Sequence, residues 1–300
     1  MLWSGPMLSR AVAPFLCAVV LVSACGGGDD DDPPGGGADA SPDDPDADIG
    51  DPGPAVAVPG ERCELIDRVG LITISTAYAY VYLYDRIDPF IGEPALADDH
   101  CAFHEYAPAE QCPACDSDEV CSIEGTCVDA PRRDPDATMV LRAGGDEQTF
   151  EADDVTGELG GTITLAAPYT LEAEFFGQVV TLEEALEGPD LLTNFSAMLI
   201  GTYDAPEGVE ADWDAAPEGT HVFTRVPINH HAAAPTFTEC VVGAEAGELS
   251  IPGEMLEPLA VSTGLEFQGF DHIVFAAAET ANGCVEIRFV TQQTVGIDGV

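Results

Sequence analysis

The sequence predicts a mainly β protein, in which a β-sandwich domain is preceded by a small disulfide-rich β-hairpin subdomain and by a disordered acidic tether. Three observations support this prediction. Short apolar runs separated by Gly, Pro and Asp recur after residue 134. Five cysteines are concentrated between residues 101 and 127. Residues 26–60 contain ten Asp, many Gly and Pro, and no basic residue.

The N-terminal segment is typical of an export signal. Arg10 precedes an almost wholly apolar stretch over residues 11–24. This stretch is too short to span a bilayer, because a spanning helix needs about 20 residues. It ends in Val22-Ser23-Ala24-Cys25, which resembles the lipobox of bacterial lipoproteins. The resemblance implies that residues 1–24 are a lipoprotein signal peptide, removed by cleavage before Cys25.

The same resemblance implies that Cys25 carries a diacylglycerol and a further acyl chain such as palmitate. Several acyl chains anchor a protein stably, whereas one does not. We therefore expect membrane attachment through this lipid in the cell envelope, with the outer membrane of a Gram-negative bacterium as the favoured location. An ordinary cleaved signal with an incidental cysteine is the alternative.

Residues 25–60 are expected to form the lipidated cysteine and its tether. A segment of this composition cannot bury enough apolar surface to offset the entropy of ordering, so we expect it to be disordered. The repulsion between its aspartates should extend the chain. The tether would thus hold the folded part away from a lipid surface.

The overall charge restricts the partners of the protein. The chain has 55 acidic residues and only nine Lys and Arg, all of them Arg, which gives a formal net charge of −46. Such a chain should repel nucleic acid and anionic lipid head groups and hold divalent cations only loosely. The absence of lysine excludes a P-loop, a Schiff-base enzyme and a protein kinase, since each needs that amine.

Residues 61–133 are expected to form the hairpin subdomain. The stretch from Val69 to Tyr84 is rich in β-branched and aromatic residues and predicts a strand, with residues 101–106 as its hairpin partner. The period of two places four tyrosines on one face of that strand: Tyr78, Tyr80, Tyr82 and Tyr84. We favour a half-buried face that packs on the next domain. The alternative is an exposed platform that stacks sugar rings or binds a partner strand.

The cysteines predict disulfides. Cys17 leaves with the signal peptide and Cys25 is lipidated, so eight cysteines remain, an even number in an exported chain. A zinc site is the alternative for the cluster between residues 112 and 127. Spacing does not establish connectivity, and the preferred pairs are Cys63–Cys101, Cys112–Cys121, Cys115–Cys127 and Cys240–Cys284.

Residues 134–300 are expected to form the β-sandwich domain. Many short apolar runs with turn residues between them indicate a sandwich or barrel. Short helices are expected at residues 182–186 and 253–261. Cys240 and Cys284, the only cysteines in this part, are expected to bridge two strands.

No residue constellation in the chain specifies a reaction, and we expect no cofactor. A non-enzymatic binding or structural role at the cell surface is favoured, with a carbohydrate or protein ligand and no nucleic acid. The alternative is a hydrolase or metal-binding protein that uses His230, His231 and His272. It requires at least two of these histidines to converge with Asp or Glu in one cleft.

Overall fold

The computed structural model describes residues 53–106, 114–153, 156–228, 236–260, 269–293 and 298–299. Strands account for most of this part of the chain, so the predicted mainly β fold is confirmed. The expected signal peptide, Cys25 and the tether up to residue 52 lie outside the described residues. No helix within the described ranges is both long enough and apolar enough to cross a membrane.

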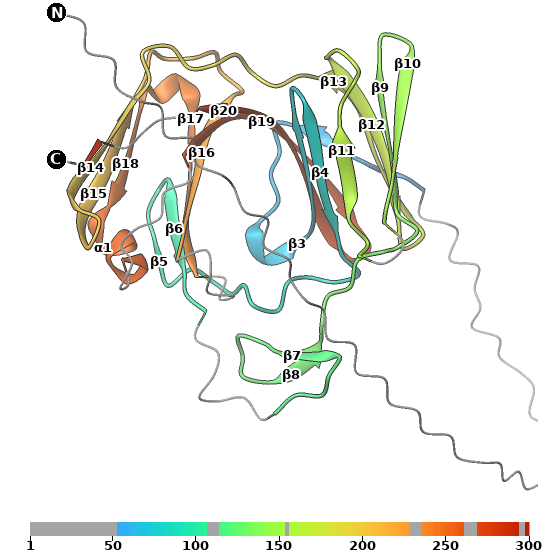
Figure 1. Cartoon of the computed structure of the whole chain (residues 1–300), viewed down its shortest axis with the longest axis horizontal. Helices are drawn as coiled ribbons and strands as arrows, with labels where there is room; N and C mark the ends of the chain where they lie inside the picture. Colours follow the sequence, from blue (N-terminus) through green and yellow to red (C-terminus); the bar gives the residue numbers. More distant parts are fainter. Residues whose placement is uncertain are drawn as a thin grey trace, which may run out of the picture. The chain divides into compact units, whose positions relative to one another are not determined.

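A ten-stranded sheet forms the centre of the fold (Figure 1). Its strands are β2 (Val58–Pro59), β3 (Arg68–Ser75), β4 (Tyr78–Leu83), β5 (Leu96–Ala97), β6 (Cys101–His104), β11 (Leu159–Thr162), β16 (His221–Pro227), β17 (Phe237–Gly243), β19 (Phe270–Thr280) and β20 (Gly283–Gln293). The main path runs β11-β4-β3-β20-β19-β16-β17-β6-β5, and β2 pairs with β19. Neighbouring strands are antiparallel except β20 and β3, which are parallel.

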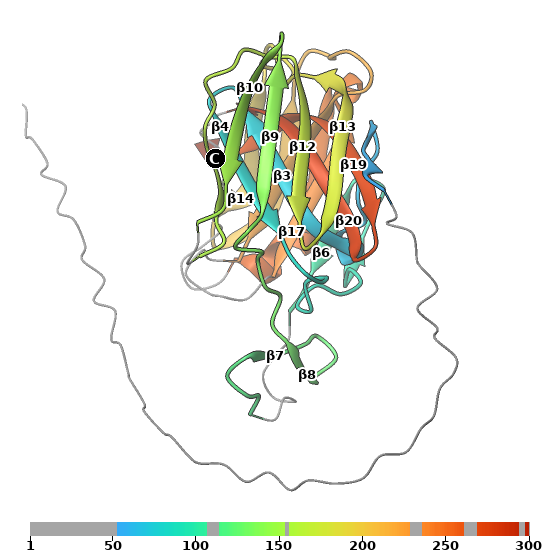
Figure 2. The same ribbon diagram turned by 90° about the vertical axis from the view of Figure 1, so that its right-hand side faces the viewer.

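A five-stranded sheet packs on one half of the ten-stranded sheet. Its strands are β1 (Ala55–Val56), β9 (Thr138–Ala143), β10 (Asp146–Glu151), β12 (Tyr169–Phe175) and β13 (Gln178–Leu186). Leu141 and Leu171 from this sheet share one buried core with Ile72 and Phe289 from the ten-stranded sheet. Figure 2 shows β9, β12 and β13 as a layer in front of β3, β19 and β20. Two sheets with a common apolar core form a β-sandwich, as predicted.

A four-stranded sheet packs on the other half. It consists of β14 (Ser196–Thr202), β15 (Ala205–Asp212), β18 (Glu248–Pro252) and β21 (Asp298–Gly299). Leu199 and Val209 form a second core with Phe103 and Val222 of the ten-stranded sheet. In Figure 1 the four-stranded sheet lies on the left and the five-stranded sheet on the right of the bent central sheet. The molecule thus contains two sandwiches that share one sheet.

Both smaller sheets cover the same face of the ten-stranded sheet. Successive side chains of a strand point to opposite faces. On β19, Phe270 belongs to the second core, whereas Ala276 and Ala278 belong to the first. These positions differ by even numbers, so they lie on one face. We call it the covered face, and we call the opposite one the polar face.

Helical elements are few. The expected helix over residues 253–261 is present in shortened form as α1 (Gly253–Leu256), followed by the 3-10 turn η3 (Glu257–Leu259). Two further 3-10 turns are η1 (Leu65–Asp67) and η2 (Ala244–Ala246). The expected helix over residues 182–186 is wrong, because these residues form the end of β13.

The expected boundary near residue 133 does not separate two folding units. Strands β3, β4 and β6 precede it, yet they lie in the same sheet as β16, β17, β19 and β20. The hairpin prediction is also corrected: β3 and β4 pair with each other, and β6 pairs with β17 and β5. Among the residues that the structure describes, only β7 (Glu119–Cys121) and β8 (Cys127–Asp129) form a separate two-stranded sheet.

The end of the expected tether is ordered. Residues 55–59 form β1, which pairs with β13, and β2, which pairs with β19. The apolar sequence Ala55-Val56-Ala57-Val58 explains the difference, because these side chains suit a pleated, half-buried surface. The tether therefore ends before residue 55 rather than at residue 60.

Two of the predicted disulfides are wrong. Cys63 is bonded to Cys284, and Cys101 is bonded to Cys240. Cys101 and Cys240 are opposite each other on the neighbouring strands β6 and β17, which brings them together although 139 residues separate them. The predicted pairs Cys63–Cys101 and Cys240–Cys284 had exchanged these partners.

The remaining predicted pairs lie around the small β7–β8 sheet. The structure joins Cys115 to Cys127, as predicted. Cys121 is also disulfide-bonded, and its expected partner Cys112 lies outside the described residues. In the chain-entropy model the two long loops, of 221 and 139 residues, each contribute about 5 kcal/mol and the short one about 3 kcal/mol.

Candidate functional site

The candidate site lies on the polar face of the ten-stranded sheet. This face is built from the alternate residues that point away from the two cores. It carries the tyrosines of β4 at one side and, farther along the sheet, four arginines with their carboxylate partners. The tyrosines were singled out from the sequence, whereas the arginines were not.

The tyrosine stripe of β4 is exposed. Tyr80 is 53% exposed and Tyr82 is 40% exposed, and Tyr78 is similarly accessible. Tyr84, just beyond the strand, is half-buried. The expectation that these rings pack on a neighbouring domain is therefore wrong. The sandwich core takes the other face of β4, where Ala79, Val81 and Leu83 are buried.

The rings of the stripe are close to one another. The ring centroids of Tyr78 and Tyr80 are 4.4 Å apart. The guanidinium of Arg133 lies 5.0 Å from the ring centroid of Tyr82 and 5.8 Å from that of Tyr84, a cation–π arrangement. Tyr78, Tyr80 and Tyr82 line an open pocket of about 490 Å³, whose other wall includes Asp153, Thr156 and Glu158. This stripe thus forms a row of aromatic faces beside polar groups.

Four arginines lie farther along the same face, three of them on β3, β16 and β20 and the fourth, Arg62, in the segment before η1. Arg68 Nη1 donates to Glu286 Oε1 at 2.9 Å, and Arg288 Nε donates to the same oxygen at 2.6 Å. Arg225 donates through Nε and Nη2 to Glu239 Oε2, and Arg62 Nη2 lies 3.3 Å from Glu239 Oε1. We call these six residues the Arg–Glu cluster: Arg62, Arg68, Arg225, Arg288, Glu239 and Glu286.

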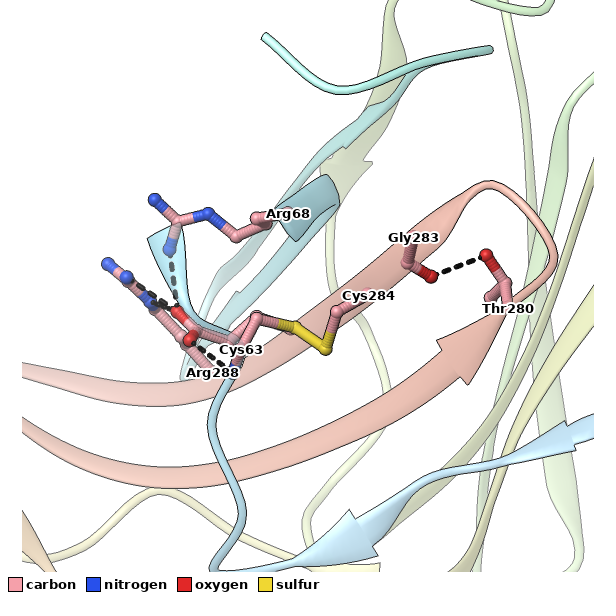
Figure 3. Close-up of a disulfide and its surroundings, with 7 residues drawn as sticks. Cys63, Arg68, Thr280, Gly283, Cys284 and Arg288 are labelled. Atoms are coloured by element: carbon pink, nitrogen blue, oxygen red, sulfur yellow. Dashed lines mark hydrogen bonds and ion pairs between the residues drawn. A yellow bond between two sulfur atoms is a disulfide. The ribbon is translucent and has the colours of Figure 1, made fainter. Parts of the chain in front are cut away.

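The sheet brings the cluster together from distant parts of the chain. Glu286 and Arg288 are neighbours on one side of β20, and Glu239 is paired with Arg225 across β17 and β16. Arg62 and Arg68 come from the segment that the Cys63–Cys284 disulfide joins to β20. Figure 3 shows Arg68 and Arg288 side by side next to this bridge. The disulfide therefore helps to hold two of the arginines on the polar face.

Burial and charge oppose each other in the cluster. Burial would raise the pKa of Glu239, but the guanidinium groups of Arg225, Arg288 and Arg68 outweigh it and lower the pKa to about 2. Burial lowers the pKa of Arg68 to about 10, although Glu286 opposes this shift. Burial also raises the pKa of Asp271 to about 6, and here Arg288 only partly compensates. Burial would also raise the pKa of Glu286, but the guanidinium groups of Arg288 and Arg68 lower it, so both glutamates are anionic at neutral pH.

Three of the guanidinium groups lie close to aromatic rings. Arg288 lies 4.3 Å from the ring centroid of Phe223, Arg62 lies 4.7 Å from that of Phe275, and Arg225 lies 4.2 Å from that of Phe237. Stacking of this kind is specific to arginine, because its guanidinium is planar and weakly hydrated.

A second pocket joins the cluster to the tyrosine stripe. It has a volume of about 530 Å³ and is lined on the sheet side by Arg68, Arg225, Tyr82 and Tyr84. Its opposite wall is formed by Asp88, Phe90, Ile91 and part of the β7–β8 unit, including Val120. We call it the arginine–tyrosine pocket. Because Tyr82 lines both pockets, the stripe leads directly into it.

The arrangement of the histidines gives little support to the enzymatic alternative. His230 and His231 lie outside the described residues. His272 is 3% exposed, and its two ring nitrogens lie 2.6 Å from Asp190 O and 2.8 Å from Thr220 Oγ1. Asp271 points to the other face of β19, so it does not orient His272. Within the described ranges, no group of three or more His, Cys, Asp or Glu side chains is arranged to hold a metal ion.

Comparisons with known proteins do not place the chain in a family. No protein-family model matches it, and no curated protein matches it. The FN1–FN3 domains of chicken CNTN1 are similar with 8% identity and a TM-score of 0.20, over 78% of this chain and 66% of that one. A tetra-tandem repeat in the extending region of a large adhesion protein has 14% identity and a TM-score of 0.15, over 76% and 49%. At these TM-scores neither similarity bears on function.

Sequence reasoning found the tyrosines but missed the Arg–Glu cluster. One signal was available. In a chain with nine Arg and no Lys, each arginine is a rare residue, and Glu286 and Arg288 alternate within a clear strand pattern. The signal could not be used, because the four arginines come from residues 62 to 288 and only the sheet order makes them neighbours.

Proposed function

We propose that this protein is an exported, lipid-anchored protein of the bacterial envelope that binds a carbohydrate on the polar face. The observation that carries the binding proposal is the exposure of the tyrosine stripe. Neighbouring rings with this much exposed surface form an aromatic patch in water, and exposed patches of this kind mark interaction sites. Sugar rings stack on such faces, while their hydroxyls need polar neighbours such as those beside the stripe.

The compartment is supported by the disulfides. Bridges form and persist in oxidising environments outside the cytosol, and three are present in the described part of the chain. The lipid anchor at Cys25 rests on the lipobox sequence alone. It is tested by replacing Cys25 with Ala and comparing the partition of the two proteins into a detergent phase. Unchanged partition would contradict lipidation and leave binding untouched.

The binding proposal is tested with the full chain and a panel of polysaccharides: cellulose, chitin, xylan and polygalacturonate. We expect wild type to bind at least one of them and the double variant Tyr80→Ala with Tyr82→Ala to lose that binding at least tenfold. Tyr203→Ala is the matched control, because Tyr203 is also exposed, at 42%, and lies outside the site. A double variant that is folded and binds as well as wild type would contradict the proposal.

A further inference from the structure

The arginine–tyrosine pocket has the features of a site for a charged sugar. Two guanidinium groups, from Arg68 and Arg225, line the same pocket as two tyrosine rings. Its volume of about 530 Å³ lies in the usual range of ligand pockets, about 300–1,000 Å³. The concentration of positive charge is unusual for this protein, since four of its nine arginines belong to the Arg–Glu cluster.

Glutamate contacts do not use all donors of these arginines. A guanidinium has five N–H groups. Among the described residues, Arg68 hydrogen-bonds only through Nη1, to Glu286, and Arg225 only through Nε and Nη2, to Glu239. The other nitrogens of the two residues are not among the buried unpaired atoms. The side chain of Arg225 is 34% exposed and that of Arg68 is 10% exposed, so both residues present free N–H groups at the surface, Arg225 more than Arg68, in the pocket that both line.

The remaining charged residue of the pocket narrows the ligand class. Asp88 Oδ1 accepts a hydrogen bond from the backbone N–H of Phe90 at 2.9 Å, and its other oxygen is an acceptor for a ligand. A simple anion would be repelled by this carboxylate. A ligand that carries hydroxyl groups as well as an anionic group can donate to Asp88 and accept from the arginines. The aromatic walls suit the faces of a sugar ring.

We propose that the arginine–tyrosine pocket binds the carboxylate of an acidic sugar, a uronic acid unit within a polysaccharide. The carboxylate accepts a pair of parallel hydrogen bonds from a guanidinium, the geometry for which arginine is suited. Neighbouring sugar units lie along the tyrosine stripe, which reaches the pocket at Tyr82. The inference rests on the proposed carbohydrate binding and specifies its ligand class.

The net charge of the chain opposes the approach of an anionic polymer. At physiological ionic strength, however, interactions between exposed charges are screened beyond about 8 Å. The charges that line the pocket therefore decide selectivity, and those of distant acidic residues do not. We expect the preference for an acidic sugar to persist at 0.15 M salt (the ionic strength to which that length refers).

The test compares polygalacturonate with the same polymer after full methyl esterification, with a chelator present to remove calcium. Both polymers have the same sugar backbone, but only the first has free carboxylates. We expect wild type to bind polygalacturonate at least tenfold more tightly than the ester. Equal affinities would overturn the inference and leave the proposed carbohydrate binding intact, whereas binding to no polysaccharide of the panel would overturn both.

Variants assign the preference to the pocket. Arg225→Gln should abolish the preference for free carboxylates, so that polygalacturonate and its ester bind with equal affinity. Arg68→Lys, which keeps the charge and its contact with Glu286, should reduce the preference by losing the paired hydrogen bonds. Arg142→Gln, on the five-stranded sheet, is the matched control and should bind as wild type. If Arg225→Gln does not fold, the preference measured for Arg68→Lys decides whether the pocket is the anion site.

Two outcomes would overturn the assignment even if anions bind. Folded variants with undiminished preference would place the anion site elsewhere. Tighter binding of polyglutamate than of polygalacturonate would identify an acidic peptide, and not an acidic sugar, as the ligand class.

Discussion

The two faces of the ten-stranded sheet differ in how they are stabilised. On the covered face, aliphatic and aromatic side chains such as Ile287 and Phe289 are fully buried against the smaller sheets. On the polar face, the same strand β20 presents Glu286 and Arg288, which are buried in ion pairs. The covered face gains its stability from the removal of apolar surface from water. The polar face combines charges that compensate one another with a small buried apolar cluster of Phe223, Ile273, Phe275 and Val290.

The difference shows that one strand can serve stability and recognition at the same time. Alternation assigns each residue of β4 and β20 to one face only. The covered residues can therefore be selected for packing without restricting their neighbours on the polar face. We expect substitutions on the covered face to change stability at every pH, and substitutions on the polar face to change binding or the pH dependence of stability.

The largest expected effect on stability comes from a substitution on the covered face. Phe289→Ala should lower the free energy of unfolding by about 3–5 kcal/mol, because a fully buried ring is replaced by a cavity. Tyr80→Ala, on the polar face, should change it by less than about 0.5 kcal/mol, because that ring is exposed. Denaturant unfolding of both variants checks the contrast. Similar losses for the two would show that the tyrosine stripe supports the fold.

The next largest effect on stability is expected when a charge on the polar face is removed. Glu239→Gln leaves Arg225 and Arg62 without their carboxylate and should destabilise the protein by about 3 kcal/mol at pH 7. The folded pKa of Glu239, about 2, is below its ordinary value of 4.5. The stabilisation is therefore complete above pH 4.5 and is lost as the pH falls through 2.

The measurement for Glu239 is unfolding of wild type and variant at pH 7 and pH 3. The difference between them should be smaller at pH 3. Glu147→Gln is the control, since that glutamate is exposed on β10. A difference that does not depend on pH would mean that Glu239 acts through packing and not through its charge.

A smaller effect, of opposite sign, is expected at Asp271. Burial raises its folded pKa from 3.8 to about 6. Its stabilising contribution is therefore complete below pH 3.8 and is lost as the pH rises through 6. Asp271→Asn cannot ionise, so it should be more stable than wild type at pH 8, by about 2 kcal/mol after allowance for solvent screening of this half-buried group. Unfolding of both proteins at pH 4 and pH 8 checks this prediction. If the difference in stability between Asp271→Asn and wild type were the same at the two pH values, the raised pKa of Asp271 would be contradicted.

Local patterns predicted the elements better than their partners. The period of two over residues 78–84 predicted that the four tyrosines share a face, and β4 shows this. It did not predict whether that face is exposed. The answer depends on which side of the sheet the two smaller sheets cover, and both faces of β4 are apolar enough to be covered. Ala79 and Val81 are the ones buried.

The cysteines show the same limit. Cys115 and Cys127 are 12 residues apart and were paired from the sequence. Cys63 and Cys101 were also assigned to each other, yet each is bonded to a strand of the C-terminal part. Their partners follow from the order of strands in the central sheet, where β6 lies beside β17 and β3 lies beside β20.

The sequence by itself determined the fold class and the alternation of residues along each strand, and it predicts an exported chain. These properties depend on composition and on contacts within a few residues. The tertiary structure alone decided which face of the central sheet is covered and which cysteines are bonded. It also decided that Arg62, Arg68, Arg225 and Arg288 meet. The physical reason is that strand pairing is non-local: a strand's own sequence specifies which side chains share a face but not which strand will lie next to it.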